Sequence, residues 1–283
     1  MNKYIVMNID EIIRHALAED IGNGDHTSLS CIPKNAKGKA RLLIKDSGIL
    51  AGVDIAQKVF NKVDSDLKVN IFLKDRSKIK KGDIAFTVEG SSISILSAER
   101  LVLNFMQRMS GIASATHELV ELIKGTKAKI LDTRKTTPLL REIEKMAVRI
   151  GGGYNHRMGL YDMIMIKDNH IDFAGGIEPA INSTLQYLKT NKLNLKIEIE
   201  ARNIDNVKEI IAIGNIHRIM LDNFSPILIK EAVKLIDNKF ETEASGGITK
   251  ENIKAYAESG VDFISVGAIT HHIKSLDMSL KAF

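Results

Sequence analysis

Apolar and polar positions follow two different patterns along the 283 residues, and the change falls near residue 97. Before it, apolar residues at helical spacing occupy residues 8–19 and 53–63. Between and after them lie strand-like apolar runs at residues 38–52, which an Asp-Ser-Gly turn divides, 68–75 and 84–90. This mixture predicts an α+β amino-terminal domain with an antiparallel sheet. A glycine- and aspartate-rich stretch at residues 19–28 indicates a loop.

After residue 97 a helical pattern extends to residue 124, and we predict a break in it at Ser110-Gly111. Short apolar runs that end in polar residues then alternate with helical patterns. The predicted strands are 128–133, 162–167, 195–200, 217–222, 240–245 and 262–267. The predicted helices between them are 139–150, 177–190, 203–213, 225–237 and 249–259. Six such units predict a parallel sheet in an incomplete TIM-like α/β barrel, and a doubly wound open sheet is the alternative.

Polar residues end every predicted strand of this second part. Chemistry in an α/β barrel lies at the carboxyl ends of the strands, so we expect these endings to form one site. They are Asp132-Thr133-Arg134-Lys135, Lys167-Asp168-Asn169-His170, Glu198-Ile199-Glu200, Asp222-Asn223, Ser245-Gly246-Gly247 and Ser265-Val266-Gly267-Ala268.

Cationic residues are concentrated between residues 131 and 170. Five of them favour an anion-binding site near the first two strand ends: Arg134, Lys135, His156, Arg157 and Lys167. Three others are expected on the solvent-facing side of a helix: Arg141, Lys145 and Arg149. A lysine at a strand end also permits Schiff-base chemistry, which stays open at this point.

Glycines after the last two strands predict a phosphate site, because exposed N–H groups there can approach an anion closely. Glu198 and Glu200 face the same side of their strand, and Asp222 ends the next one. These carboxylates could bind Mg²⁺ together with substrate oxygens, stabilise a developing cation, or pair with Lys135 or Lys167. The remaining histidines near strand ends, His170, His271 and His272, lack the helical spacing of a zinc-protease motif.

Composition describes an ordinary globular protein, with 44% hydrophobic and 27% charged residues. The net charge is +5, but basic residues are spread along the chain and there is no tryptophan, so a small polyanion fits better than nucleic acid. Cys31 is the only cysteine, which excludes an intrachain disulfide and a cysteine-based zinc cluster. We see no signal peptide and no membrane span, and we predict a cytoplasmic location.

Several long motifs occur in one order over nearly the whole chain. They include Glu19-Asp-Ile-Gly, Asp132-Thr-Arg-Lys-Thr-Thr-Pro, Gly151-Gly-Gly-Tyr-Asn-His-Arg, Ile166-Lys-Asp-Asn-His, Ile197-Glu-Ile-Glu and Ser245-Gly-Gly-Ile. In these motifs the chain resembles the quinolinate phosphoribosyltransferases, also called nicotinate-nucleotide pyrophosphorylases (carboxylating). A paralogous group linked to molybdenum transport shares part of the Thr-Arg-Lys-Thr motif, and the intact Gly-Gly-Gly-Tyr-Asn-His-Arg stretch favours the quinolinate enzymes.

The resemblance implies an α/β sandwich domain at residues 1–108, joined by the tail 270–283, and a barrel at 109–269. It implies a homodimer with shared active sites, or a higher oligomer built from it. The implied reaction joins quinolinate to phosphoribosyl pyrophosphate in de novo NAD biosynthesis, with Mg²⁺, and gives nicotinate mononucleotide, pyrophosphate and CO₂. Neither nucleic acid nor a membrane is an expected partner.

The resemblance also implies individual roles. Substrate-binding residues would be Arg100 (lent across the dimer interface), Thr133, Arg134, Lys135, His156, Arg157, Lys167, Glu200, Asp222, Ser245, Gly246, Gly247, Val266, Gly267, Ala268 and His271. Lys135, Glu200 and Asp222 would be catalytic, and Glu200 and Asp222 would also hold the metal. The chain departs from the family at Leu139, where the family usually has glycine. The competing hypotheses are a Schiff-base aldolase that uses Lys135 or Lys167 and a non-catalytic sensor of a phosphorylated metabolite.

Overall fold

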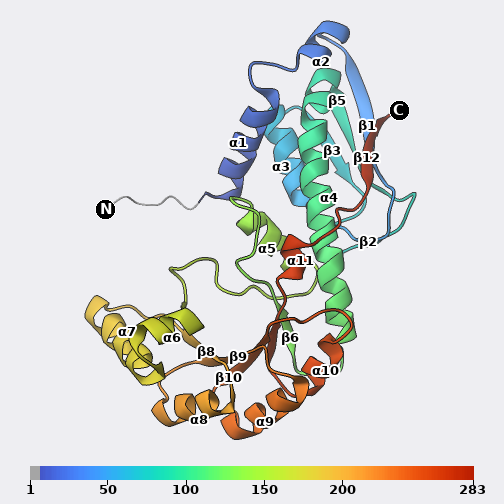
Figure 1. Ribbon diagram of the computed structural model, residues 1–283. Coiled ribbons are helices and arrows are strands. Elements are labelled where there is room, and N and C mark those ends of the chain that lie inside the picture. The colour runs from blue at the N-terminus through green and yellow to red at the C-terminus, as the bar shows by residue number, and fades with distance from the viewer. Residues whose placement is uncertain (1–6) are drawn as a thin grey trace. The chain divides into compact units, whose positions relative to one another are not determined.

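The computed structural model describes residues 7–283. The first six residues, for which the sequence analysis predicted no signal peptide, lie outside the described part. Its backbone contacts divide the chain into two compact units (Figure 1). One contains the chain up to His117 with Thr136–Gly152 and Ile269–Phe283, and the other contains Glu118–Lys135 and Gly153–Ala268. The predicted domain limit between residues 108 and 109 falls inside one long helix, α4 (Ser92–Leu122), and stays a prediction.

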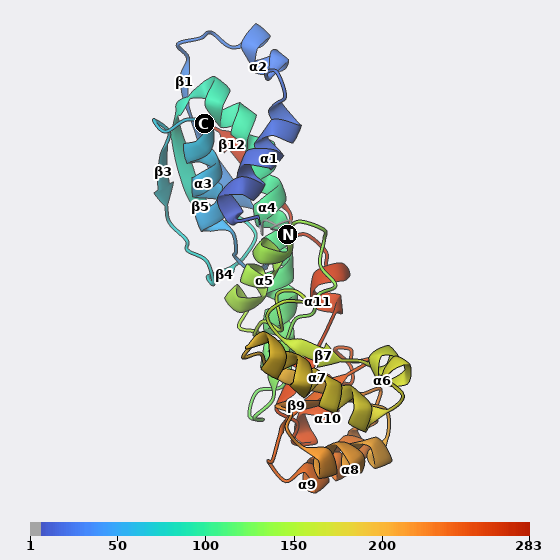
Figure 2. The same ribbon diagram turned by 90° about the vertical axis from the view of Figure 1, so that its left-hand side faces the viewer.

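The first unit is built on a four-stranded antiparallel sheet with the order β12-β1-β5-β3. These strands are β1 (Lys37–Ile44), β3 (Lys68–Ile71), β5 (Ile84–Ser91) and β12 (Met278–Ala282), and a separate pair joins β2 (Gly48–Ile49) to β4 (Lys78–Ile79). Its helices besides α4 are α1 (Ile9–Ile21), α2 (His26–Cys31), α3 (Val53–Val63) and α5 (Arg141–Ile150). Helix α3 lies beside the sheet (Figure 2). The ring of Phe60 in α3 meets Phe86 of β5 edge to face, with centroids 5.9 Å apart. The antiparallel amino-terminal sheet is therefore confirmed.

Helix α4 continues through Ser110-Gly111, so the break predicted there is wrong. The Ser110 hydroxyl accepts the Ala51 N–H at 2.9 Å and donates to the Ala51 carbonyl at 3.1 Å. Gly111 lies against the backbone of Lys274, where a Cβ atom would have no room. These two residues therefore serve close packing on both sides of a continuous helix, and their low helix propensity is overridden.

The predicted loop at residues 19–28 is shorter in the structure. Helix α1 continues to Ile21, and the short helix α2 begins at His26. Asp25 starts α2 by accepting the Ser28 N–H at 3.0 Å, which is the usual role of an aspartate at a helix amino terminus.

The second unit contains a six-stranded parallel sheet with the order β6-β11-β10-β9-β8-β7. The strands are β6 (Lys129–Leu131), β7 (Ile164–Ile166), β8 (Ile197–Ala201), β9 (Arg218–Asp222), β10 (Glu241–Ser245) and β11 (Phe263–Ser265). The helices of this unit are α6 (Asp168–Ala174), α7 (Ile177–Asn191), α8 (Ile204–Ile213), α9 (Pro226–Ile236) and α10 (Ile253–Glu258), and α11 (Ala268–His271) begins at its last residue and belongs otherwise to the first unit. Each strand and helix predicted after residue 127 has its counterpart, and the helix predicted at 139–150 is α5 of the first unit.

The strand order decides between the two predicted architectures. From β7 to β11 each strand lies beside its neighbour in sequence, and β11 then pairs with β6. A doubly wound sheet reverses its order at a switch point, and this sheet does not. Within residues 7–283, β6 and β7 form no ladder with each other, so the α/β barrel is incomplete, as predicted.

Strand β8 carries two acidic side chains although the whole strand is buried. All five of its residues, Ile197–Ala201, are buried. Alternate residues face opposite sides of a strand, so the apolar ones pack outward while Glu198 and Glu200 share the other face. Among residues 7–283, no helix is both long and apolar enough to cross a membrane.

Candidate active site

The carboxyl ends of the parallel strands lie next to one another in the second unit. The ladder pairs Ser245 with Asp222 at the ends of β10 and β9, and Ser265 with Leu131 at the ends of β11 and β6. Val266, one residue further on, donates its N–H to the Leu131 carbonyl at 3.0 Å. The polar strand endings listed from the sequence are therefore brought to the same edge of the sheet.

Two arginines near this edge repel each other. Arg157 is half-buried and donates one N–H to the Met163 carbonyl at 3.2 Å. Burial lowers the pKa of its guanidinium, and the positive charge of Arg134 lowers that pKa further. Like charges held close together are costly unless an anion joins them, so this pair favours a ligand that carries negative charge.

Lys167 and Glu200 form an ion pair across the ends of β7 and β8. The distance from Lys167 Nζ to Glu200 Oε1 is 2.5 Å, and the other oxygen of Glu200 accepts the Asp168 N–H at 3.0 Å. The salt bridge that the sequence analysis left open for Lys167 is confirmed. In the loop after β6, the Lys135 N–H is donated to the Thr133 hydroxyl at 3.0 Å, and the Lys135 side chain lies exposed.

Asp222 lies among other carboxylates at the end of β9. Burial raises its pKa, and the negative charges of Glu200 and Asp168 add to the rise, while Lys167 opposes it. The Asp222 carboxylate also accepts the side-chain N–H of Asn223 at 2.7 Å. A cation bound between Glu200 and Asp222 would remove the repulsion, so the donor set and its charge fit a divalent metal with oxygen ligands.

The glycine pair after β10 has a backbone that other residues adopt with strain. Gly246 has φ = +93° and Gly247 has φ = +60°. At Gly246, an added Cβ would also collide with Asn223, whose N–H is bonded to the Ser245 carbonyl at 2.8 Å. The turn therefore requires glycine at position 246 and leaves backbone exposed beside the carboxylates, as a phosphate site needs. Gly267 and Ala268 follow β11, at the start of α11.

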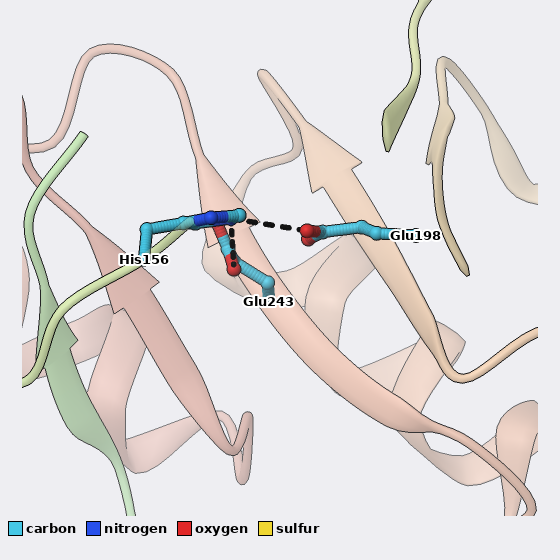
Figure 3. Close-up of side chains that lie close together, drawn as sticks. All are labelled: His156, Glu198 and Glu243. Carbon is cyan, nitrogen blue, oxygen red and sulfur yellow. Dashed lines mark ion pairs between the residues drawn. The ribbon is translucent and has the colours of Figure 1, made fainter. Parts of the chain in front are cut away.

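A layer of buried charges lies among the strands (Figure 3). His156 Nε2 lies 3.0 Å from Glu198 Oε2 and 3.4 Å from Glu243 Oε2, and all three residues are buried. On β9, Arg218 holds Glu243 with an Nη1–Oε2 distance of 2.8 Å and Glu241 with an Nη2–Oε2 distance of 3.0 Å. The sequence analysis did not identify Glu243 or Arg218, although charged residues inside apolar strands were a visible signal.

The protonation of this layer depends on the contacts of His156. Burial opposes a charged imidazole, whereas hydrogen bonds and charges from Glu198 and Glu243 act to raise the pKa of His156. A charged ring needs a hydrogen on Nδ1, yet Nδ1 accepts the Arg157 N–H at 2.7 Å. That contact decides the assignment, because two donors cannot face each other at this distance, so the ring hydrogen lies on Nε2. Burial and the charge of Glu243 raise the pKa of Glu198 to about 7.

The remaining predicted residues lie in the first unit. Arg100 lies exposed on α4, and His271 ends α11 with its ring 4.4 Å from that of His272. Among residues 7–283, the one group of three side chains with metal-ligand geometry is His156, Glu198 and Glu243, so the histidines near the later strand ends form no such group.

Helix α5 corrects one prediction about exposed cations. Lys145 is 1% exposed, so it does not lie on a solvent-facing side with Arg141 and Arg149. Its neighbour Glu144 is also buried and pairs with Arg108 of α4 at 2.6 Å. Helix α5 therefore buries both Glu144 and Lys145, which the local charge pattern does not reveal.

The loop that follows the Thr-Arg-Lys motif is fixed by the same pair. Arg108 donates to the Thr137 hydroxyl at 2.8 Å, and Glu144 accepts the Thr137 N–H at 3.2 Å. Two residues on, Leu139 has φ = +66°, a left-handed conformation that favours glycine. The loop thus keeps the backbone shape of a glycine although this chain carries leucine.

Family models for the amino-terminal and carboxyl-terminal domains of quinolinate phosphoribosyl transferase match residues 25–110 and 112–281. A Bacillus subtilis protein named probable nicotinate-nucleotide pyrophosphorylase (carboxylating) is 42% identical over 97% of this chain and 93% of its own length. A tobacco protein named quinolinate phosphoribosyltransferase (decarboxylating) 2b, mitochondrial, is 46% identical over 97% of this chain and 82% of its own. The solved structure of the nicotinate-nucleotide pyrophosphorylase from Francisella tularensis superposes with a TM-score of 0.89 at 40% identity, covering 100% of this chain and 98% of that one.

The names of the relatives correct the predicted location and answer the question of family. Besides the mitochondrial tobacco protein, relatives from Arabidopsis thaliana and rice are named chloroplastic, so the prediction of a cytoplasmic location is contradicted. Neither the composition nor the single cysteine indicated that relatives of this chain carry organellar names. Two domain models together cover most of the described chain, and the relatives match along nearly its full length. The chain belongs to the quinolinate phosphoribosyltransferase family.

Proposed function

We propose that this chain transfers the phosphoribosyl group of phosphoribosyl pyrophosphate to quinolinate and releases CO₂, giving nicotinate mononucleotide and pyrophosphate for NAD biosynthesis. Its relatives carry the names of this activity. The observation that carries the proposal is the group of cations at the ends of the first strands: exposed Arg134 and Lys135 after β6, half-buried Arg157, and Lys167 after β7. Quinolinate offers two adjacent carboxylates, and each guanidinium can bind one of them with two parallel hydrogen bonds.

The chemistry requires little beyond positioning and charge. As pyrophosphate leaves, positive charge develops on the ribose, and the carboxylates of Glu200 and Asp222 stabilise it. The quinolinate nitrogen attacks the anomeric carbon and becomes a pyridinium. The bond from the ring to the adjacent carboxylate then breaks, its electron pair enters the ring carbon, CO₂ leaves, and a proton takes its place. Lys135, which is exposed in the loop after β6, would bind both anionic substrates.

Glu200 and Asp222 would hold Mg²⁺ together with oxygens of phosphoribosyl pyrophosphate. The support is the repulsion among carboxylates that raises the pKa of Asp222. When bound, the ion neutralises charge on the departing pyrophosphate. Glu200 also keeps Lys167 oriented through their 2.5 Å contact, so one carboxylate serves both a substrate-binding cation and the metal.

The glycine turn after β10 would bind the 5′-phosphate. The support is the turn at Ser245, partly exposed Gly246 and exposed Gly247, which ends β10. Its neighbouring strand β11 is followed by Val266, Gly267 and Ala268.

The active form would be a homodimer in which Arg100 of one chain completes the quinolinate site of the other. Arg100 is exposed on α4, which leaves its guanidinium available to a partner. A complementation test separates this from a monomeric enzyme. Arg100→Ala and Lys135→Ala proteins, each inactive alone, should regain part of the activity when mixed, because a mixed dimer contains one intact site. No recovery after verified subunit exchange refutes the shared site.

The test of the reaction is to incubate the purified protein with quinolinate, phosphoribosyl pyrophosphate and Mg²⁺ and to measure nicotinate mononucleotide and CO₂ together. Equal amounts of both are expected. Lys135→Ala and Arg157→Ala should fold normally and lose turnover, and retained turnover in both contradicts the assigned site. Binding of phosphoribosyl pyrophosphate without release of pyrophosphate would instead identify a sensor, and borohydride trapping of an adduct on Lys135 or Lys167 would identify an aldolase.

A further inference from the structure

We propose that the amino ends of the barrel strands form a second anion-binding site, for a small ligand that carries two or more linked phosphate groups. The site is a pocket of about 800 Å³ within the second unit, and we call it the amino-end pocket. The proposal does not depend on the proposed function. The charged residues of the lining are Lys127, Lys129, Lys196, Lys239, Glu241 and Asp262.

The pocket spans the beginnings of five neighbouring strands of the parallel sheet. Lys129, Glu241 and Phe263 are the first residues of β6, β10 and β11. Lys196 and His217 each directly precede a strand, β8 in one case and β9 in the other. Because the strands are parallel, their beginnings lie at one edge of the sheet, and residues far apart in the sequence line one pocket.

The length of the strands separates this pocket from the residues at the strand ends. Glu241 lines the pocket, whereas Ser245 ends the same strand about 13 Å further along it, in the glycine turn. Packed side chains fill the interior of a barrel between its two ends. A ligand in the amino-end pocket is therefore distinct from a ligand of the candidate active site.

Positive charge in the lining exceeds negative charge, because four lysines face two acids. Both acids already have a cation. Asp262 pairs with Lys127, with an Nζ–Oδ1 distance of 2.7 Å, and Glu241 pairs with Arg218 at 3.0 Å. Among residues 7–283, no acid lies within ion-pair distance of the other three lysines, Lys129, Lys196 and Lys239. Cations that converge on one pocket in this way attract an anion.

Aromatic rings hold one of these lysines without neutralising it. Lys129 Nζ lies 5.1 Å from the ring centre of Tyr154 and 5.9 Å from that of Phe263. The face of a ring attracts a cation but carries no net charge, so the ammonium group is held at the pocket and keeps its charge. A cation supported by its neighbours is ready to bind before the ligand arrives.

His217 adds a hydrogen-bond donor to the lining. Its Nδ1 accepts the Ile197 N–H at 3.0 Å, so the ring hydrogen lies on Nε2. The residue is exposed and lines the pocket, which leaves the Nε2–H free to donate to an oxygen of an anion.

The kind of cation favours phosphate over carboxylate. Lysine binds as a point charge, whereas arginine offers the planar fork that matches a carboxylate. Arg218, beside the pocket, is already taken up by Glu241 and Glu243. Linked phosphates carry several charges on oxygens that point in many directions, so separate ammonium groups can reach them together. The volume lies in the range of pockets for small ligands, which suits a molecule no larger than a nucleotide.

Two triple variants separate a built site from general attraction by a basic protein. The pocket variant is Lys129→Gln, Lys196→Gln and Lys239→Gln. The control variant removes three exposed lysines of the same unit that lie on α7 and α9, outside the pocket: Lys189→Gln, Lys230→Gln and Lys234→Gln. All proteins in the titrations, including the reference, also carry Lys135→Ala and Arg157→Ala, so that the candidate active site contributes little anion binding.

Two measurements are made. Calorimetry gives the dissociation constants of tripolyphosphate, of citrate and of phthalate, which has two adjacent carboxylates. The pocket variant should bind tripolyphosphate at least about a hundredfold more weakly than the reference, and the control variant less than about threefold more weakly. Citrate and phthalate should bind the reference more weakly than tripolyphosphate does. In the second measurement, mass spectrometry should show that tripolyphosphate slows the acetylation of Lys129, Lys196 and Lys239 and leaves that of Lys230 unchanged.

Equal weakening in the two triple variants overturns the proposal, because net charge alone would then explain the binding. No measurable tripolyphosphate binding to the reference protein overturns it too. Citrate that binds as tightly as tripolyphosphate contradicts the phosphate class. A single-stranded RNA that binds more tightly than tripolyphosphate, and is lost in the pocket variant, identifies a nucleic-acid surface instead. If the pocket variant does not fold, the acetylation of the reference protein decides, and equal rates with and without tripolyphosphate refute the site.

Discussion

Replacing Arg218 by methionine tests whether the buried charges of the barrel depend on one another. Arg218 is 8% exposed, and Glu243 beside it is fully buried. The guanidinium contacts Glu243 at 2.8 Å and Glu241 at 3.0 Å, and it lies 4.0 Å above the ring centre of Phe263. Methionine keeps much of the apolar length of arginine, so the substitution chiefly removes the charge and leaves the packing of the strand similar.

The expected cost follows from the acid that is left behind. Breaking a buried ion pair on one side leaves an uncompensated charge and costs about 3–5 kcal/mol. The lost contact of the guanidinium with Phe263 adds about 0.5–1 kcal/mol. Glu241→Gln is the matched control, because the Glu241 side chain is 40% exposed and its pair with Arg218 should contribute only about 0–1 kcal/mol. Arg218→Met combined with Glu243→Gln should recover most of the loss, since the acid that Arg218 neutralised is then uncharged.

The pH dependence gives the prediction a sign. In wild type, burial raises the pKa of Glu243, but His156 and Arg218 outweigh this and hold the pKa below its usual value. That carboxylate therefore contributes stability above its unfolded pKa of about 4.3, and the contribution is lost as pH falls through the lower folded pKa. Without Arg218, burial is opposed by His156 but no longer by the guanidinium, so the pKa of Glu243 should be higher than in wild type. The deficit of the variant should therefore shrink as pH falls from 7 toward 5, because protonation removes the charge that Arg218 neutralised.

The assay is urea unfolding at pH 7 and pH 5, followed by circular dichroism, for wild type, Arg218→Met, Glu241→Gln and the double variant. A deficit below about 1 kcal/mol at pH 7 refutes the claim that the charges are interdependent. An equal deficit at both pH values refutes the assignment of the uncompensated charge to Glu243, and a double variant as unstable as the sum of its parts refutes it too.

Three further predictions concern the loops around the strand ends. Leu139→Gly should raise stability by about 0.5–1 kcal/mol, seen as a higher Tm, because the residue is 72% exposed and its φ of +66° is strained; an unchanged or lower Tm contradicts the strain. Gly246→Ala should weaken the binding of phosphoribosyl pyrophosphate, measured by calorimetry, by at least about tenfold, because the added Cβ meets Asn223, and it should leave the binding of phthalate unchanged. Gly247→Ala should have a smaller effect, because no atom lies within 4 Å of its added Cβ, and a larger effect at Gly247 than at Gly246 would contradict the proposed phosphate turn. Asp222→Asn should lower the affinity for Mg²⁺ measured by calorimetry with phosphoribosyl pyrophosphate present, and wild-type affinity would remove Asp222 from the metal site.

The fold could be predicted from the sequence because its main signal is local. Each barrel strand is an apolar run bounded by polar residues, and strands β8 and β9 lie within one or two residues of the predicted bounds. The prediction failed where a distant contact overrides a local preference. Ser110-Gly111 has the composition of a helix break, yet Ser110 is bonded to Ala51, which is 59 residues away in sequence. Lys145 has the spacing of an exposed cation, yet it is buried.

The candidate site divides in the same way. The residues at strand ends, such as Lys167 and Asp222, were predicted because the topology of a parallel barrel places every carboxyl end at one edge. Arg218 and Glu243 were not, because their roles depend on strand register. The pairing of β9 with β10 places Arg218 opposite Glu241. Glu243 lies two residues further along β10, so both acids contact the same guanidinium. Until the register is known, the alternation of acids and small residues in β10 indicates a solvent-exposed strand.

The pair of acids on β8 shows why a single strand can serve both stability and chemistry. Glu198 and Glu200 are two residues apart, so they share a face and stand about 6–7 Å apart along the strand. The deeper one, Glu198, meets His156 and contributes to a layer that exists without a ligand. The outer one, Glu200, meets Lys167 and the N–H of Asp168, next to the residues that would bind substrate. The strand therefore carries one acid for the buried layer and one for the strand-end cation Lys167, two residues apart on the same face.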